Sequence, residues 1–172
     1  MIEIRSLKKS DNRSGFTCGN LELDYFFQKF AGQNQYKHYI GVTYVAVLKE
    51  KIIGFISVNS SSLQNKNFAK LPNYPLPVLN LARIAVDKNF QNLGVGKKLL
   101  KFALLLSLEQ KNRFGCIGVT VDTKEESIDF YKKYGFFELE RKEPTRYKNT
   151  TLMFLDMKTI EKAVYHKNSP LT

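Results

Sequence analysis

The sequence has little of what disulfide, metal and membrane proteins need. Among its 172 residues only two are cysteine, Cys18 and Cys116, and two are histidine. Two cysteines and an N-terminus with no apolar signal region argue against a disulfide framework and for a reducing cytoplasm. So few sulfur and imidazole ligands disfavour a structural zinc site, and no apolar run approaches the roughly 20 residues that span a bilayer. We therefore expect a cytoplasmic globular protein without a metal, whose two thiols are buried and structural.

Acidic residues are also scarce. There are 16 Asp and Glu against 27 Lys and Arg, which gives a formal net charge of +11. Such an excess favours an anionic partner, whether nucleic acid, a membrane surface or an acidic ligand, but a lysine-rich solvated surface explains it equally well. The length and the 43% hydrophobic fraction fit one domain with a sizeable core. We place that domain at residues 1–165 and expect a frayed tail at 166–172.

The most informative stretch runs from Leu79 to Leu100. Its dense apolar start, 79–86, predicts a strand buried on both faces. A polar turn then carries Gln-Asn-Leu-Gly-Val-Gly at 91–96, and a long apolar-periodic helix follows at once. Glycines allow close backbone approach, and the first turn of a helix offers free N–H groups and positive potential. The stretch therefore predicts an anion site suited to a pyrophosphate, although a plain tight turn also accounts for the glycines.

Two common nucleotide-binding patterns do not fit this turn. The third glycine of Gly-x-Gly-x-x-Gly is missing, and the spacing of a Walker loop is absent. What remains is Gln-x-x-Gly-x-Gly after a buried strand, which resembles the acyl-CoA pyrophosphate loop of the GNAT superfamily of N-acetyltransferases. A second stretch resembles the same superfamily, with a small residue four positions before a tyrosine and then Gly-Phe at the next strand. The matching residues are Ser127, Tyr131, Gly135 and Phe136.

The remaining pattern predicts the order β-α-β-β-β-α-β-α-β-β, an α/β fold with a mixed central sheet and helices on both faces, as in the GNAT fold. We expect Asn20 to cap the first helix and Asp122 or Thr123 to cap the helix that carries Tyr131. The polar segments 32–41 and 60–67 are expected to be irregular. The expected strands are 2–5, 43–48, 52–58, 79–86, 116–121, 136–139 and 151–157, and a last helical turn or two is expected at 160–164.

The resemblance implies direct acetyl transfer from acetyl-CoA, a co-substrate, to a primary amine, with no metal. Backbone groups of Ile84, Ala85 and Val86 are then expected to pair with the pantetheine arm as an added strand does. Amides of the turn are expected to cradle the pyrophosphate. The other residues of this expected cofactor-binding set are Gln91, Asn92, Leu93, Gly94, Val95, Gly96, Lys97 and Ser127.

For the chemistry, the resemblance implies that Tyr131 protonates the departing CoA thiolate, because a phenol is still protonated at neutral pH. Without the family, Tyr131 reads as an aromatic residue on a core-facing helix. Asn80 and Arg83 lie on the site strand, where they either orient the acceptor or are purely structural. No general base is apparent, so a bound water or an amine that arrives neutral has to serve.

A narrower resemblance concerns a toxin-like GNAT subgroup. Residues 16–26 look like its Cys-Gly-x-x-x-Leu-Asp-x-Phe/Leu element, and 81–87 look like its site strand. Characterised members acetylate the α-amine of aminoacyl-tRNA and block translation, pair with a small DNA-binding antitoxin and form homodimers. The basic charge fits a tRNA partner, because phosphate contacts carry most non-specific affinity. Candidates for that surface are Lys132, Lys133, Arg141, Lys142, Arg146 and Lys148.

The acceptor is the open part of this interpretation. Asn92 stands where the loop pattern has glycine, and the segment 141–149 has no clear match in the subgroup. Acetylation of a small amine or of a protein amine is the alternative within the fold. The non-enzymatic alternative is a binding module that keeps the CoA cleft for sensing or partner recognition.

Overall fold

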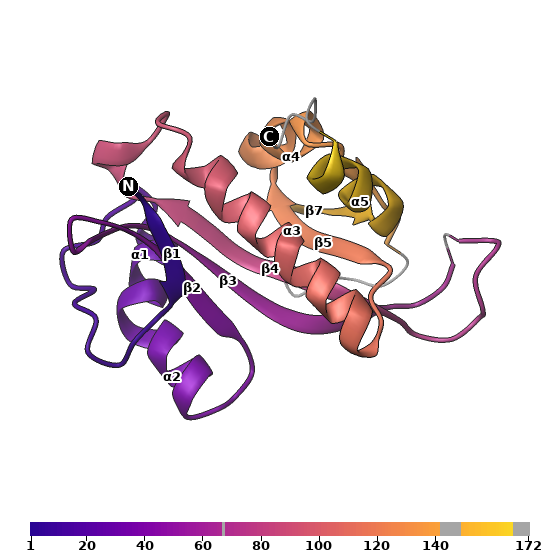
Figure 1. The fold of residues 1–172 in the computed structure, drawn as a ribbon, viewed down its shortest axis with the longest axis horizontal. Coiled ribbons are helices and arrows are strands. Elements are labelled where there is room, and N and C mark those ends of the chain that lie inside the picture. The colour runs from indigo at the N-terminus through magenta and orange to yellow at the C-terminus, as the bar shows by residue number, and fades with distance from the viewer. Residues whose placement is uncertain (67, 142–148, 167–172) are drawn as a thin grey trace. The chain divides into compact units, whose positions relative to one another are not determined.

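The computed structural model describes residues 1–66, 68–141 and 149–166 (Figure 1). The described strands form one seven-stranded sheet in the order β1-β2-β3-β4-β5-β7-β6. This confirms the predicted order of elements and the α/β class. The strands are β1 (Glu3–Ser6), β2 (Val42–Leu48), β3 (Lys51–Leu63), β4 (Leu76–Val86), β5 (Gly118–Lys124), β6 (Phe137–Glu138) and β7 (Thr150–Asp156). The helices are α1 (Leu21–Tyr25), α2 (Ala31–Tyr36), α3 (Val95–Phe114), α4 (Ile128–Lys133) and α5 (Met157–Tyr165), and a π-helical segment, η1 (Phe26–Phe30), joins α1 to α2.

The chain divides into two compact units. The first contains Met1–Asn59 and Leu81–Ala103, and the second contains Ser60–Asn80 and Leu104–Thr172. Strand β4 and helix α3 each contribute residues to both units, so neither unit is a separate stretch of sequence.

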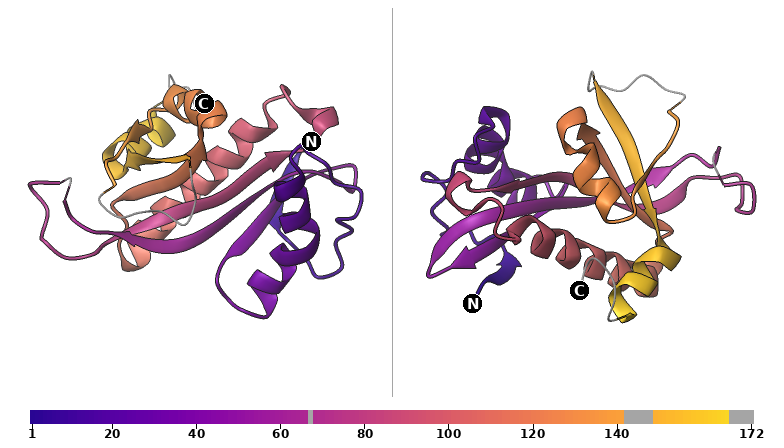
Figure 2. Two further views of the ribbon diagram at one scale, coloured as in Figure 1. Left: turned by 180° about the vertical axis from the view of Figure 1, so that it is seen from behind. Right: turned by 90° about the horizontal axis from the view of Figure 1, so that it is seen from above.

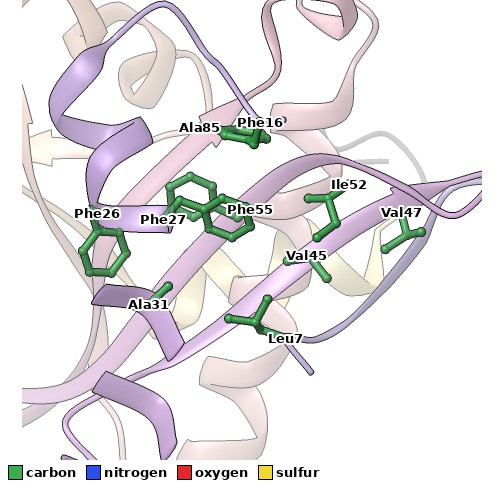
Figure 3. Packing of buried hydrophobic residues seen from close by; sticks show 10 residues of the cluster. All are labelled: Leu7, Phe16, Phe26, Phe27, Ala31, Val45, Val47, Ile52, Phe55 and Ala85. Atoms are coloured by element: carbon green, nitrogen blue, oxygen red, sulfur yellow. The ribbon is translucent and has the colours of Figure 1, made fainter. Parts of the chain in front are cut away.

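In the first unit, β1 pairs antiparallel with β2, and β2 with β3. Figure 1 shows α1 and α2 beside these strands, and Figure 3 shows the apolar side chains between them. The rings of Phe27 and Phe55 stack there with centroids 4.4 Å apart. Successive residues of a strand face opposite sides, so the neighbouring Gly54 faces α3. A Cβ at Gly54 would lie 3.0 Å from Leu99 Cδ1 and 3.1 Å from Val95 Cγ1, which means that α3 begins in close contact with β3.

In the second unit, β7 pairs antiparallel with both β5 and β6. Helix α5 packs on β5 and β7, as the yellow helix in Figure 2 shows. Gly118 opens β5, where a Cβ would lie 2.3 Å from Leu155 O. Only glycine fits there without a shift of the backbone.

The first helical region is longer than the sequence predicts. Residues from Gly32 on are helical as far as Tyr36, although their polar composition favours an irregular segment. The side chain of Gln35 explains this, because its amide donates to Leu7 O at 3.2 Å and its carbonyl accepts from Thr43 N at 3.0 Å. Tertiary hydrogen bonds thus hold a turn that propensity alone does not. The predicted cap is confirmed: Asn20 Oδ1 accepts from Leu23 N at 3.1 Å.

Three further expectations about local structure are wrong. Strand β3 continues to Leu63, past the point where an irregular segment is predicted. Asp122 and Thr123 cap no helix, because both lie inside β5 and pair with β7. The last helix begins at Met157, where the sequence predicts the end of the strand, rather than at 160, since Asp156 caps it by accepting from Thr159 N at 3.0 Å. In the described part of the chain, no helix is both long and apolar enough to cross a membrane.

Candidate active site

The predicted anion site is a short, well-fixed turn between β4 and α3, which we call the β4–α3 turn (residues 87–94). At its start, Asp87 N donates to Ile53 O at 2.9 Å. The Asp87 carboxylate is 1% exposed and accepts from Asn89 N at 3.0 Å, which caps a single 3-10 turn over Lys88–Phe90. The chain therefore leaves the end of the strand in one defined direction.

Two residues of the turn have left-handed backbone. Asn92 has φ +61° and Gly94 has φ +78°. Asparagine is among the few residues with a side chain that adopt this region readily, so Asn92 can stand where the family pattern has glycine. A Cβ on Gly94 would meet no described atom within 4 Å, so crowding by the protein does not explain the glycine. The open space leaves this backbone free for a ligand to approach.

Helix α3 starts directly after this turn with its N-terminus uncovered. Its first ladder bond runs from Lys98 N to Gly94 O at 3.1 Å, so the N–H groups of Val95, Gly96 and Lys97 precede the ladder. The Val95 side chain is 1% exposed and anchors the turn in the core, while Leu93 is 66% exposed. Free N–H groups, the positive end of a 20-residue helix and an open glycine together make a site for an anion.

Gln91, which is expected to help bind the cofactor, makes two hydrogen bonds within the protein. Its side-chain amide donates to Cys18 O at 2.9 Å and to Val86 O at 3.1 Å. Both amide hydrogens are thus used to tie the turn to the end of β4 and to the segment before α1. In this conformation Gln91 shapes the turn and does not offer a donor to a phosphate.

The predicted burial of the site strand on both faces holds only for its first half. Residues 76–81 are largely buried, but Ile84 and Val86 are half-buried and only Ala85 is enclosed. The half of β4 expected to pair with pantetheine is therefore the more open half.

The two expected acceptor residues lie in different units. Arg83 belongs to the first, where its guanidinium lies over the Phe26 ring with Cζ 3.8 Å from the centroid. No described residue accepts a hydrogen bond from it, so its donors are available to a ligand. Asn80 belongs to the second unit, where its Oδ1 accepts from Thr120 Oγ1 at 3.2 Å. That bond ties the Asn80 side chain to the neighbouring strand β5.

Tyr131 lies in the second unit on α4 and is 3% exposed. Its ring contacts Phe130 and Phe136 edge to face, with centroids 5.1 Å and 5.3 Å away. Its carbonyl accepts from Tyr134 N and Phe136 N, where Gly135 with φ +93° ends the helix as predicted. Within the described residues the hydroxyl has no hydrogen-bond partner. Burial raises the pKa of Tyr131, so the phenol keeps its proton at any physiological pH.

The other predicted residues of the second unit are placed as follows. Ser127 precedes α4, is half-buried and makes no capping bond with its side chain. Lys132 pairs with Glu138 at 3.3 Å, and Arg141 pairs with Asp122, so these cations are partly neutralised. Lys133 is exposed. The predicted surface residues Lys142, Arg146 and Lys148 lie outside the described residues.

The two cysteines differ. Cys116 is buried, as expected, but Cys18 is only half-buried, because its segment runs along the surface before α1. Burial and the neighbouring Asp24 carboxylate raise the pKa of Cys18 to about 11. Its thiol is therefore protonated at neutral pH and is a poor nucleophile.

A family model described as "Acetyltransferase (GNAT) domain" matches residues 40–138, more than half of the chain. The chain belongs to the GNAT acetyltransferase family. The matched range includes β4, the β4–α3 turn and Tyr131.

Individual GNAT relatives are more distant. The chain is 26% identical over 140 residues to a "tRNA-acetylating toxin" of Mycobacterium tuberculosis (strain ATCC 25618 / H37Rv), covering 77% of this chain and 82% of the relative. A Tyr-to-Phe variant of the AtaT toxin, bound to the C-terminus of the antitoxin AtaR and acetyl-CoA, superposes with TM-score 0.78 at 21% identity, covering 96% and 99% of the two chains. AtaT complexed with acetyl-methionyl-tRNAfMet gives TM-score 0.79 at 22% identity over 94% and 98%. These structures share the fold of this chain.

Proposed function

We propose that this GNAT protein transfers the acetyl group of acetyl-CoA to the α-amine of aminoacyl-tRNA and so acts as a translation-blocking toxin. The assignment of acetyl-CoA as the donor is supported by the anion site at the start of α3. In that site Gly94 has φ +78°, and a Cβ there would meet no described atom within 4 Å. The acceptor rests on the similarity to a tRNA-acetylating toxin over 77% of the chain. The net charge of +11 supports a polyanionic acceptor.

In this proposal the β4–α3 turn binds the pyrophosphate of acetyl-CoA. The N–H groups of 94–97 donate to its oxygens, and the helix dipole favours its charge. The backbone of 84–86 binds the pantetheine arm as an added strand, since the side chains at this end of β4 leave it half-open. Backbone groups therefore bind the cofactor, and no charged side chain has to be buried to hold it.

The transfer step needs one acid and one proton acceptor. The neutral α-amine attacks the thioester carbonyl carbon, an N–C bond forms and the C–S bond breaks. The phenol of Tyr131 gives its proton to the departing thiolate, and the extra proton on nitrogen leaves to water. The buried, clamped ring and the unpaired hydroxyl of Tyr131 fit this role. The return of a proton from solvent to Tyr131 completes the cycle.

For the acceptor we assign Arg83 rather than Asn80. Arg83 has unpaired guanidinium donors and stacks on Phe26, which pre-orients its plane for a phosphate or a carbonyl. Asn80 already bonds Thr120, so we leave it as a structural residue. From the predicted tRNA-binding set we retain Lys133, which is exposed.

We also propose the organisation around this activity. Both units form one acetyltransferase domain over residues 1–165, because β4 and α3 contribute to each. Homodimerisation, a small DNA-binding antitoxin and a cytoplasmic location follow from the same toxin assignment. The complex of AtaT with the antitoxin AtaR supports the antitoxin partner.

The decisive experiment follows isotope from labelled acetyl-CoA. Label is expected in charged tRNA and not in deacylated tRNA, and a panel of small amines and protein substrates runs beside it. If label enters only a small amine or a protein, aminoacyl-tRNA is not the acceptor. If no amine is labelled, the protein is a CoA-binding module without transferase activity.

The donor site has its own control. Gly94→Val is expected to abolish CoA binding measured by calorimetry, because it fills the open approach and strains a left-handed residue. Gly115→Val imposes the same kind of strain at φ +97° outside the turn and is expected to bind CoA normally. Equal affinity for both variants and the unmodified protein contradicts the site.

A further inference from the structure

We propose that Asp24 is a positioning residue that holds the β4–α3 turn in the shape that receives the pyrophosphate. This inference rests on the proposed function, because it takes the turn to be the CoA site. It adds to the reaction a buried carboxylate on α1 that touches neither donor nor acceptor.

Asp24 is one of the few charged side chains buried in the first unit, at 7% exposed. Its Oδ1 accepts from Cys18 N at 2.8 Å, and its Oδ2 accepts from Thr17 Oγ1 at 3.0 Å. Its own N donates to Asn20 O at 3.0 Å, within the capped first turn of α1. Both carboxylate oxygens are thus fixed on a helix and committed to two consecutive residues outside it.

The segment that Asp24 holds, residues 16–18, belongs to no helix or strand. Phe16 is buried in the core at 3% exposed, and its carbonyl accepts from Gln28 Nε2 at 3.1 Å. The helical region therefore binds this segment at three residues in a row. The two contacts at Thr17 and Cys18 both depend on Asp24.

The same segment binds the β4–α3 turn at two points. Thr17 O accepts from Lys88 N at 2.9 Å near the start of the turn, and Cys18 O accepts from Gln91 Nε2 at 2.9 Å near its middle. Because Asp24 fixes residues 17 and 18 through its two hydrogen bonds, it also fixes the positions of these two carbonyls. A continuous chain of hydrogen bonds therefore runs from α1 through residues 17 and 18 to the β4–α3 turn.

Charge makes Asp24 suited to this task. A carboxylate accepts shorter and stronger hydrogen bonds than a neutral group does, so it fixes the carbonyls of the segment more firmly than an amide would. Loss of the carboxylate leaves Cys18 N and Thr17 Oγ1 without their acceptor and lets the segment, and with it the turn, adopt other arrangements.

The test compares two ligands on the full chain. Asp24→Ala is expected to weaken CoA binding about tenfold by calorimetry, and Asp24→Asn less, because it keeps one acceptor. Affinity for pantetheine, which lacks the pyrophosphate, is expected to stay unchanged when followed by ligand-observed NMR. A general structural loss would weaken both ligands together, so an equal loss on both overturns the positioning role.

Matched variants keep the test sharp. Asp11 is also a partly buried carboxylate of the first unit. It accepts hydrogen bonds from Arg5 and Lys8 N, and within the described residues it makes none to residues 16–18 or to the β4–α3 turn. Asp11→Ala is expected to lower the melting temperature while leaving CoA affinity unchanged. If Asp24→Ala does not fold, Thr17→Val removes one bond with little change in shape and is expected to weaken CoA binding, with Thr17→Ser restoring it.

The outcomes separate the two claims. If the unmodified protein binds no CoA, the proposed function fails and this inference fails with it. If the unmodified protein binds CoA and the Asp24 and Thr17 variants bind it equally well, the inference alone is wrong.

Discussion

The side-chain amide of Gln91 donates to the carbonyl of Cys18 at 2.9 Å, across 73 residues of sequence. This bond joins the Cys-Gly element before α1, which resembles a toxin-like subgroup, to the Gln-x-x-Gly-x-Gly turn before α3, which resembles the GNAT family as a whole. The glutamine of the second motif therefore has a partner in the first. Its second hydrogen bond, to Val86 O at 3.1 Å, fixes the turn to the end of the site strand.

We expect Gln91→Ala to weaken CoA binding by up to about thirtyfold, because two hydrogen bonds worth roughly 1 kcal/mol each hold the turn. Gln91→Glu is expected to be worse, since a carboxylate cannot donate to either carbonyl and repels the pyrophosphate. Calorimetry with CoA measures both. Gln35→Ala is the matched control, because Gln35 also bridges backbone groups in the first unit but, within the described residues, makes no hydrogen bond to the β4–α3 turn. A similar loss in the control contradicts this role of Gln91.

Asn92 gives a prediction about the one departure from the loop pattern. At φ +61°, Asn92→Gly relieves strain and is expected to keep CoA affinity and stability. Asn92→Val places a β-branched residue in the left-handed region and is expected to destabilise the turn by about 1–2 kcal/mol and to weaken CoA binding. Denaturant unfolding together with calorimetry checks both. Equal behaviour of the two variants means that the backbone angle is not what selects asparagine.

The sequence predicts the parts of this site that depend on local pattern. The buried strand, the glycine turn, the start of α3 and the stop at Gly135 all follow from periodicity and backbone preference. It does not predict the hydrogen bonds between distant segments. These are the bonds from Gln91 to Cys18 O, from Thr17 to Asp24 and from Thr120 to Asn80. Such contacts depend on which segments the fold brings together, and one sequence carries no record of them. The same limit explains α2, whose polar turn is held by Gln35 rather than by its own propensity.

Tyr131→Phe is expected to lower kcat by about 10²–10⁴-fold while KM for acetyl-CoA stays similar, because general acid catalysis contributes on that order. The ring contacts with Phe130 and Phe136 remain, so the melting temperature should not change. Burial raises the Tyr131 pKa above its usual 10, so the acid form is complete below pH 10, and kcat should show no alkaline limb from this group. Full activity in the variant, or a limb below pH 9 that the variant abolishes, contradicts the assignment.

The reactivity of the Cys18 thiol tests the contact with Asp24 in the absence of any ligand. Its pKa of about 11 leaves roughly one thiol in a thousand ionised at pH 8, so alkylation by iodoacetamide should be slow and should accelerate about tenfold per pH unit up to pH 10. The raised pKa also favours the folded state below the ordinary value near 9, and this contribution is lost as pH rises toward 11. Asp24→Asn removes the neighbouring charge, which lowers the pKa and speeds alkylation at pH 8. Mass spectrometry in a Cys116→Ser background follows this site alone. An unchanged rate in Asp24→Asn would show that burial by itself sets the Cys18 pKa.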